Sequence, residues 1–329
     1  MNHIRWGLLS TANINRRLIP AIRASARGEL AAVASRSQAA AALYADAWDI
    51  PLAFDSYEAM LASDAIDAVY ISLPNHLHAE WTIRALHLGK HVLCEKPFAL
   101  TLAEVDAMIA AAAQTGRVLA EAFMYRHHPQ TKIAGEWVRS GRLGEITAVR
   151  AVFNYAMASR QNIRLNPDWG GGCLWDVGVY PVSLAQFLLG GPPVQAAGAQ
   201  ILGPSGVDED FLGQMWYAGG AIAQIQASFR CPFYTTAEVI GSEGRLSFTR
   251  PFVFTLDPAE RRLIFHPREG DPIEVATPEE ELYAGEVADM HAAILDGAPP
   301  YLSLAETRDH VRTVLALYES ARQNRILPL

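Results

Sequence analysis

Along the first 124 residues, short apolar runs alternate with segments whose apolar positions recur at helical spacing. The runs predict buried strands at residues 4–9, 30–34, 51–54, 67–72, 91–94 and 118–123. The segments between them, such as residues 14–26 and 101–114, predict helices, and Thr101 and Glu104 have the spacing of a capping box. Strands that are apolar throughout and separated by helices pair in parallel. The pattern predicts an α/β domain with a doubly wound parallel sheet.

After residue 124 the pattern changes, and strands dominate residues 194–275. The runs 211–218 and 221–229 flank Gly219-Gly220, a dipeptide typical of a tight hairpin. Helices are predicted at residues 129–140, 174–189, 279–296 and 304–324, and residues 145–155 alternate as a long strand. We expect an α+β domain with a large, mostly antiparallel, open-faced sheet. Its open face should be solvated or covered by a second subunit, and we favour the subunit.

Composition bounds the class of protein. With 329 residues, 50% of them hydrophobic, the chain can form two domains, which we place at residues 1–124 and 125–329. A net charge of −8 argues against a nucleic-acid or anionic-membrane binder. The sequence shows no secretory signal and no run long enough to span a bilayer, so we expect a cytoplasmic protein. Its three cysteines are far apart and its histidines lack metal spacing, which predicts free thiols and no metal.

The first strand is followed by a turn of small residues and then by a helix, which is how a mononucleotide-binding unit begins. The free N–H groups of such a helix can bind a phosphate. Ser10 and Ala12 stand where this turn usually carries glycines. The turn alone therefore leaves open whether this is a nucleotide-binding loop or an ordinary connection.

The second strand ends in Ser35 and Arg36, where an NAD-binding unit usually has an acidic residue for the ribose 2′-hydroxyl. A guanidinium pairs with a 2′-phosphate that a carboxylate would repel. The residues therefore favour NADP. The alternative is a surface arginine that opens the next helix.

Further candidates follow the next two strands, because open parallel sheets bind ligands at the carboxyl ends of their strands. Asn75 and His78 lie after residues 67–72, where either could contact a cofactor or cap a helix. Glu95, Lys96 and Pro97 follow residues 91–94 and are either a reaction site or a solvated ion pair.

In the second half, Asp176 and Tyr180 are four residues apart and so share one face of a helix. Residues 170–172 are all glycine, and we expect them to leave the start of this helix open to a ligand. An acid and a phenol on one face suit proton transfer and hydroxyl recognition. The alternative is a buried hydrogen bond between the two that only fixes the helix.

Together these motifs resemble a known family. Glu95-Lys96-Pro97 after a strand, followed by Gly-Gly-Gly-x-Leu-x-Asp-x-Gly-x-Tyr at residues 170–180, is similar to the glucose-fructose oxidoreductase / inositol dehydrogenase / rhizopine catabolism (Gfo/Idh/MocA) family. The likeness extends to residues 121–126 and to Tyr283-x-x-Glu286. The first turn and Ser35-Arg36 resemble the branch of NADP-dependent D-xylose 1-dehydrogenases and dihydrodiol dehydrogenases.

The resemblance implies an N-terminal Rossmann domain and an open-faced sheet through which many members form dimers or tetramers. It implies that Lys96 is catalytic with Asp176 and Tyr180 beside it, and that the Lys96–Pro97 bond is cis. Many relatives carry histidine where this chain has Tyr180, so the proton donor does not transfer directly from them. Either Tyr180 exchanges the proton while Lys96 polarises the substrate oxygen, or the roles are reversed.

We expect these side chains to converge on a nicotinamide ring. The expected cofactor-binding residues are Ser10, Thr11, Ala12, Asn13, Ile14, Ser35, Arg36, Ser72, Leu73, Asn75, His78, Glu95, Lys96, Arg126 and Tyr283. The expected substrate-binding residues are Lys96, Arg164, Trp169, Asp176 and Tyr180.

The leading function is hydride transfer between NADP, or less favourably NAD, and a hydroxyl or carbonyl carbon of a sugar or cyclic polyol. A nicotinamide-dependent glycoside hydrolase and a non-catalytic cofactor sensor are the alternatives. The complete set of Lys96, Asp176 and Tyr180 argues against the sensor, which needs no such chemistry.

Overall fold

The computed structural model describes residues 3–252 and 260–329, and the chain forms two compact units. The first unit contains Met1–His127 and Glu281–Arg308, and the second contains His128–Glu280 and Asp309–Leu329. Residues 281–308 thus lie with the first unit, whereas the sequence pattern placed them with the second.

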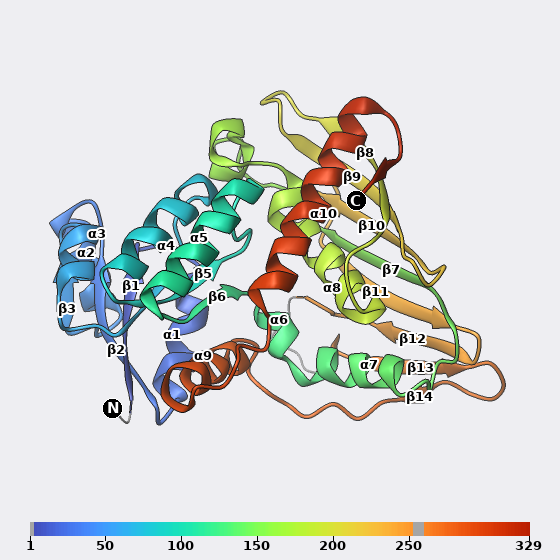
Figure 1. Ribbon diagram of the computed structural model, residues 1–329, viewed down its shortest axis with the longest axis horizontal. Helices are drawn as coiled ribbons and strands as arrows, with labels where there is room; N and C mark the ends of the chain where they lie inside the picture. Colours follow the sequence, from blue (N-terminus) through green and yellow to red (C-terminus); the bar gives the residue numbers. More distant parts are fainter. Residues whose placement is uncertain (1–2, 253–259) are drawn as a thin grey trace. The chain divides into compact units, whose positions relative to one another are not determined.

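The first unit has a six-stranded sheet in the order β3-β2-β1-β4-β5-β6, and its neighbouring strands all pair in parallel (Figure 1). This is the doubly wound order of a Rossmann fold, so the predicted fold class is confirmed. The strands are β1 Ile4–Leu9, β2 Gly28–Ala34, β3 Leu52–Phe54, β4 Ala68–Ile71, β5 His91–Glu95 and β6 Leu119–Ala122. The helices are α1 Asn15–Ala24, α2 Gln38–Ala47, α3 Tyr57–Ala62, α4 His78–His87, α5 Leu102–Thr115, α6 Met124–His127 and α9 Ala284–Asp296, with a short 3₁₀ turn at Asn75–Leu77.

Local sequence explains where these helices begin. Ser37, Ser56 and Thr101 cap α2, α3 and α5 through their side-chain oxygens. At α5 the Glu104 carboxylate also accepts from the backbone of Thr101, which confirms the predicted capping box.

Helix α9, near the C-terminal end of the sequence, joins the first unit through a buried contact with a residue of β1. The indole N–H of Trp6 donates to Nε2 of His291 at 2.9 Å, and Nδ1 of that ring lies 3.1 Å from the Ser25 hydroxyl. Arg27 adds an ion pair with Asp296. These contacts explain why the segment returns to the first unit.

The second unit has a nine-stranded sheet in the order β14-β13-β12-β11-β7-β10-β9-β8-β15. Among the described strands of this second sheet, only β10 and β7 pair in parallel, so the predicted mostly antiparallel sheet is confirmed. The strands are β7 Ile146–Asn154, β8 Gln195–Leu202, β9 Asp208–Trp216, β10 Ile222–Ser228, β11 Tyr234–Gly241, β12 Gly244–Phe248, β13 Leu263–Pro267, β14 Ile273–Glu274 and β15 Leu327–Pro328. The helices are α7 Pro129–Arg139, α8 Val179–Leu189 and α10 Leu304–Gln323, of which the part from Asp309 belongs to this unit.

One face of this sheet is covered by helices and the other is open. Strands β9 and β10 form the predicted hairpin, in which Trp216 pairs with Ile222. Along β10, Ala223, Ile225 and Ala227 are buried beneath the helices, while Gln224 is exposed on the other face. Helix α10 packs closely because Gly198 and Gly213 lack side chains: a Cβ at Gly198 would lie 2.4 Å from the Leu317 carbonyl oxygen.

The stretch Pro167–Leu189 has the length and hydropathy of a possible membrane span. In the fold, however, 89% of its most apolar window is buried. This burial is what a core helix requires.

Glu121 on β6 makes the stability of the first unit depend on pH. Burial raises the pKa of its carboxyl from 4.5 to about 8, although Thr307 and the Phe98 backbone lower it. Between these values the folded chain holds a proton that the unfolded chain has lost, so stability falls as pH rises.

We expect Glu121→Gln, which is neutral at every pH, to lessen the fall in Tm between pH 5.5 and 8.5. Most of this interval lies between the ordinary pKa of a glutamate, 4.5, and the raised pKa of Glu121, about 8, where folding takes up a proton. Thermal unfolding at several pH values measures this effect. The exposed Glu145→Gln variant is the control, and it should follow the wild-type curve. Parallel curves for Glu121→Gln and wild type would contradict the assignment.

Candidate active site

In the first unit, three buried polar side chains shape the turn between β1 and α1. The hydroxyls of Ser10 and Ser72 are 2.9 Å apart, and Ser72 donates to Oδ1 of Asn15 at 2.7 Å. The Asn15 amide in turn donates to the Ser10 carbonyl at 2.8 Å. Because Ser10 follows β1 and Ser72 follows the neighbouring β4, the network ties two strand ends together.

Ser10 has a φ of 140°, a conformation that normally belongs to glycine. A side chain held there costs roughly 1–3 kcal/mol and persists only where its surroundings fix it. The network with Ser72 and Asn15 provides that fixation, so a serine occupies a position where such turns usually have glycine. Sequence reasoning missed Asn15, because a polar residue in the first turn of a helix carries no specific signal.

The start of α1 presents backbone groups that side chains leave unused. Its N-cap residue Ile14 makes no side-chain capping bond, and Asn13 is exposed. After β2, Ser37 caps the next helix, while Arg36 is exposed. Within the described residues, Arg36 has no hydrogen bond or ion pair in the fold. Both features suit an anionic ligand.

Lys96 directly follows β5, and the Lys96–Pro97 bond is cis, as the resemblance implied. Behind it, the two ring nitrogens of His78 lie 2.8 Å from the carbonyl oxygens of Leu73 and Pro97. His78 therefore clamps the loop after β4 to the loop after β5. Its buried ring is occupied by this clamp, whereas Asn75 and Lys96 are half-buried.

Glu95 points back into the unit, where it accepts a short hydrogen bond from the Tyr70 phenol. The Glu286 carboxyl is buried nearby. Its burial is the main cause that raises its pKa well above the usual range, and the negative charge of Glu95 raises it further. Tyr283 is buried beside both acids, and burial raises the pKa of its phenol. These side chains form an interior acidic cluster.

Arg126 is also interior, since only 1% of it is exposed and its guanidinium pairs with Glu306 at 2.6 Å. For Arg126 and Tyr283, both expected to bind cofactor, the structure thus shows buried contacts within the first unit.

In the second unit, the Asp176 carboxylate is held from both sides. Tyr155 donates its phenol to Oδ2 at 2.7 Å, and Nε of Arg164 lies 2.8 Å from Oδ1. The Asp176 charge raises the pKa of Arg164, and burial raises that of Tyr155. The carboxylate is thus fixed between a neutral donor and a cation. Sequence reasoning found Arg164 but missed Tyr155.

Tyr180 lies four residues further along the same helical stretch and is buried. Its ring centroid is 5.3 Å from that of Phe153 and 5.7 Å from that of Phe252. Phe153 lies in β7, and Tyr155 directly follows the end of this strand. Tyr180 thus packs against the end of β7, and Asp176 is bound by the residue that follows this strand. Trp169, in a 3₁₀ turn just before, is 38% exposed.

The helix start that follows the three consecutive glycines, residues 170–172, is not open as we expected. Leu174–Gly178 is a π-helix, and the N–H of Leu174 donates to Oδ2 of Asp208 at 2.8 Å. At Gly172, φ is 125° and a Cβ would lie 2.0 Å from Oδ1 of the same aspartate. The helix start is thus occupied by a protein carboxylate, so the prediction that it is open to a ligand was wrong.

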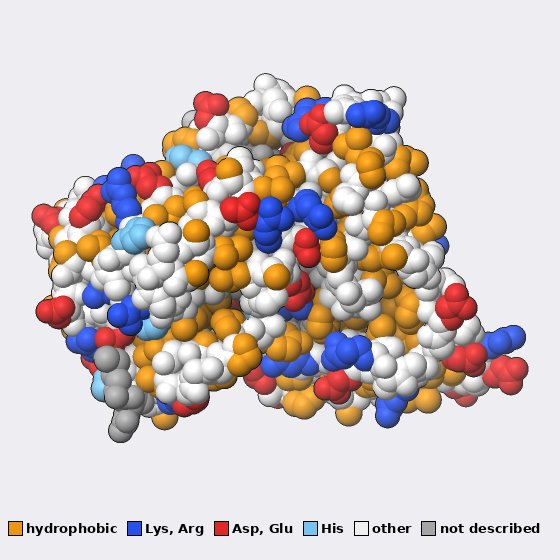
Figure 2. Space-filling view, in the orientation of Figure 1, with side chains coloured by type: hydrophobic (Ala, Val, Ile, Leu, Met, Phe, Trp, Pro, Cys, Tyr) orange, Lys and Arg blue, Asp and Glu red, His pale blue; other side chains and the backbone are white. Residues whose placement is uncertain are grey.

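Charge and metal chemistry add little to this picture. On the face that Figure 2 shows, positive side chains lie among negative ones rather than in a separate patch. Among residues 3–252 and 260–329, no group of three or more histidine, cysteine or acidic side chains is placed to hold a metal ion.

Comparison with known proteins places these features in context. Residues 4–123 match the family model described as "Oxidoreductase family, NAD-binding Rossmann fold". Residues 131–247 match the "GFO/IDH/MocA C-terminal domain". The first match lies within the first unit and the second match within the second unit.

Individual relatives match along nearly their full length. The chain is 39% identical to D-xylose 1-dehydrogenase (NADP(+)) 2 of Haloferax volcanii, covering 96% of this chain and 97% of that protein. The 3-ketoreductase KijD10 of Actinomadura kijaniata, solved with NADP and TDP-benzene, is 30% identical with a TM-score of 0.88, over 97% of this chain and 98% of that one. Aldose-aldose oxidoreductase of Caulobacter crescentus, solved with glycerol, is 25% identical with a TM-score of 0.92, over 99% and 100%.

Proposed function

Since this chain belongs to the Gfo/Idh/MocA oxidoreductase family, we propose that it transfers a hydride between NADP and a hydroxyl or carbonyl carbon of a sugar or related cyclic polyol. The observation that carries the proposal is its near-complete match to a dehydrogenase named for NADP and D-xylose. We place the reaction in the cytoplasm.

The residues of the first unit fit a dinucleotide. The uncapped start of α1 offers N–H groups to a phosphate, and the turn before it is fixed by Ser10. Arg36 is exposed where a 2′-phosphate would be read. We therefore assign cofactor binding to residues 1–124, with Ser10–Ile14, Ser35, Arg36 and Asn75 as the principal contacts. When bound, the nicotinamide supplies the hydride chemistry.

The chain's own residues orient the substrate and move its proton. Lys96 polarises the reacting oxygen and Tyr180 exchanges the proton, with the reverse division as the alternative. Asp176 is held by Tyr155 and Arg164, and it accepts hydrogen bonds from substrate hydroxyl groups and so aligns the sugar. Among the structures of KijD10 are a Tyr→Phe variant and a Lys→Ala variant, the same two residue types to which we give these roles.

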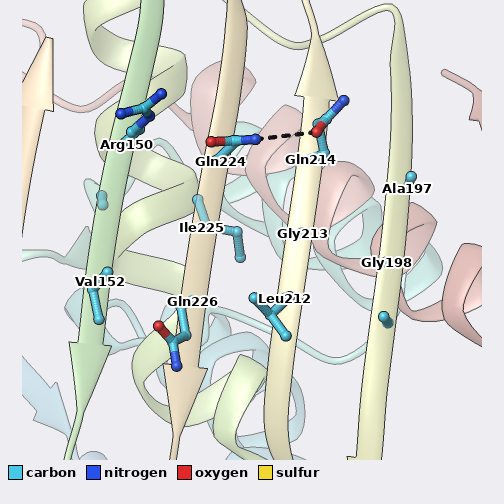
Figure 3. Close-up of a pocket in the computed structure, with 12 residues that line it drawn as sticks. Arg150, Val152, Ala197, Gly198, Leu212, Gly213, Gln214, Gln224, Ile225 and Gln226 are labelled. Atoms are coloured by element: carbon cyan, nitrogen blue, oxygen red, sulfur yellow. Dashed lines mark hydrogen bonds between the residues drawn. The ribbon is translucent and has the colours of Figure 1, made fainter.

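We assign substrate binding and assembly to residues 125–329, with the open sheet face joining two copies of the chain. Rows of side chains cross this face: Leu212, Gln226 and Val152 lie side by side in one, and Gln214, Gln224 and Arg150 in the next (Figure 3). They line a hollow of about 490 Å³. Glutamine both donates and accepts, so a second copy turned by a two-fold axis can satisfy Gln214, Gln224 and Gln226 while the apolar side chains Leu212 and Val152 are buried.

We expect purified protein to change the nicotinamide absorbance when NADP is mixed with at least one member of a panel of aldoses, inositols and dihydrodiols. Lys96→Ala and Tyr180→Phe should each lower kcat by about 10²–10⁴-fold, because each removes a group that polarises or protonates the reacting oxygen. Sugar cleavage without net absorbance change would favour the glycoside hydrolase instead. Wild-type turnover by Lys96→Ala would remove lysine from the mechanism.

Arg36→Ala should raise KM for NADP by about 10- to 100-fold, because it removes a hydrogen-bonded charge pair with the 2′-phosphate. It should leave KM for NAD nearly unchanged, because NAD lacks that phosphate. Initial rates with each cofactor measure the ratio. The control is Arg84→Ala, which removes an exposed arginine that pairs with Glu80 on α4. Equal effects on the two cofactors would show that Arg36 does not read the 2′-phosphate.

Leu212→Glu should convert an assembled protein into a monomer, because Leu212 is an apolar side chain that is 56% exposed on the open face. Light scattering during size-exclusion chromatography measures the mass. Leu43→Glu is the matched control, because Leu43 is 73% exposed but lies on α2 in the first unit. An unchanged mass for Leu212→Glu would argue against assembly through this face.

A further inference from the structure

We propose that Asp208 is a positioning residue, which anchors the π-helical segment that presents Asp176 and Tyr180 and thereby sets turnover rather than cofactor affinity. The inference rests on the proposed function, because it assumes that Asp176 and Tyr180 act on substrate. Neither the sequence motifs nor the family comparison drew attention to Asp208, which begins β9 at some distance along the chain.

Asp208 gathers hydrogen-bond donors from two other parts of the unit. Its Oδ2 accepts from the Leu174 N–H at 2.8 Å and from the Cys173 thiol at 3.1 Å. Its Oδ1 accepts from the Tyr318 phenol of α10 at 2.8 Å. Asp208 is only 2% exposed. One buried carboxylate therefore joins the first strand residue of β9, the start of the π-helix and a core helix.

The backbone is shaped around this carboxylate. Gly172 approaches so closely that a Cβ would lie 2.0 Å from Oδ1 of Asp208 and 2.8 Å from the Tyr318 hydroxyl. The ring of Trp175 also packs against that of Tyr318, with the two ring centroids 5.7 Å apart. Gly172, the last of the three consecutive glycines, is thus required by the anchor.

The anchor matters because of the helix type that follows. A π-helix is rare, and it appears mostly as a single turn, frequently at a functional site. Leu174, which Asp208 holds, lies two residues before Asp176. A shift of this start would carry the Asp176 carboxylate away from the phenol of Tyr155, which directly follows β7 in a separate segment of the unit.

The charge on Asp208 strengthens the anchor. Its donors are an amide, a thiol and a phenol, all neutral, and the amide belongs to the start of a helix, where the peptide dipoles favour a negative group. Burial raises the pKa of Asp208, and the Leu174 N–H is the first of the hydrogen bonds that lower it. An asparagine has the same shape, but it is uncharged and one of its two acceptor oxygens is replaced by an NH2 group, which cannot accept the hydrogen bond that the oxygen received.

The test is Asp208→Asn, with Asp210→Asn as the matched control. Asp210 lies two residues along β9 and interacts with Ser228 and Arg230. We expect Asp208→Asn to lower kcat by about 10- to 100-fold, the effect of losing a hydrogen bond to a charged group, with KM for NADP within about 2-fold of wild type. Asp210→Asn should keep the wild-type kcat. A folded Asp208→Asn with wild-type kcat, or an equal loss in Asp210→Asn, overturns the proposal.

If Asp208→Asn does not fold, Tyr318→Phe tests the same proposal. It removes one donor and leaves the carboxylate, and it should lower kcat by about 3- to 10-fold. A wild-type kcat for this variant overturns the proposal.

Amide hydrogen exchange of the peptide that contains Leu174 and Asp176 supplies a readout independent of activity. Exchange should be faster in Asp208→Asn and Tyr318→Phe than in wild type, and unchanged exchange overturns the anchor. If wild-type protein turns over no sugar, the proposed function fails, and exchange alone decides whether Asp208 holds the segment.

Discussion

The carboxylate of Asp176, fixed between the Tyr155 phenol and the Arg164 guanidinium, is the interaction on which the candidate site of the second unit depends. Its two partners come from the end of β7 and from the loop that follows, while Asp176 itself is in the π-helix. Three separate segments must therefore be in place before the carboxylate has a defined direction. The covered face of the sheet supplies that order, because Phe153 and Tyr180 pack in the same layer.

The first unit meets a comparable requirement by other means. Its strand ends need a tight, fixed turn, which such folds usually obtain from glycine. Here Ser10, Ser72 and Asn15 form a buried network that holds a serine at a positive φ. In both units, a buried polar side chain sets the path of the backbone beside the residues with chemical roles. The cost of burying these groups is offset by complete hydrogen bonding.

Much of the fold follows from patterns that are local in sequence. The apolar runs predicted the parallel sheet, Gly219-Gly220 the hairpin and Thr101 with Glu104 the capping box, because each depends on neighbouring residues. Tyr155 and Asp208 escaped prediction, since their importance comes from partners 21 and 34 residues away. The triglycine motif misled us for the same reason: its shape serves a distant carboxylate. His291, 285 residues from Trp6, likewise gave no sign that its helix returns to the first unit.

That return has a consequence for biosynthesis. The chain passes from one unit to the other after His127, after Glu280 and again after Arg308. A ribosome therefore releases all six parallel strands long before it makes the helix that covers Trp6. Until then the indole N–H lacks its native acceptor, and the nascent sheet must wait, incompletely covered, while the whole antiparallel sheet except β15 is synthesised. Maturation of the N-terminal half is thus tied to completion of nearly the entire polypeptide.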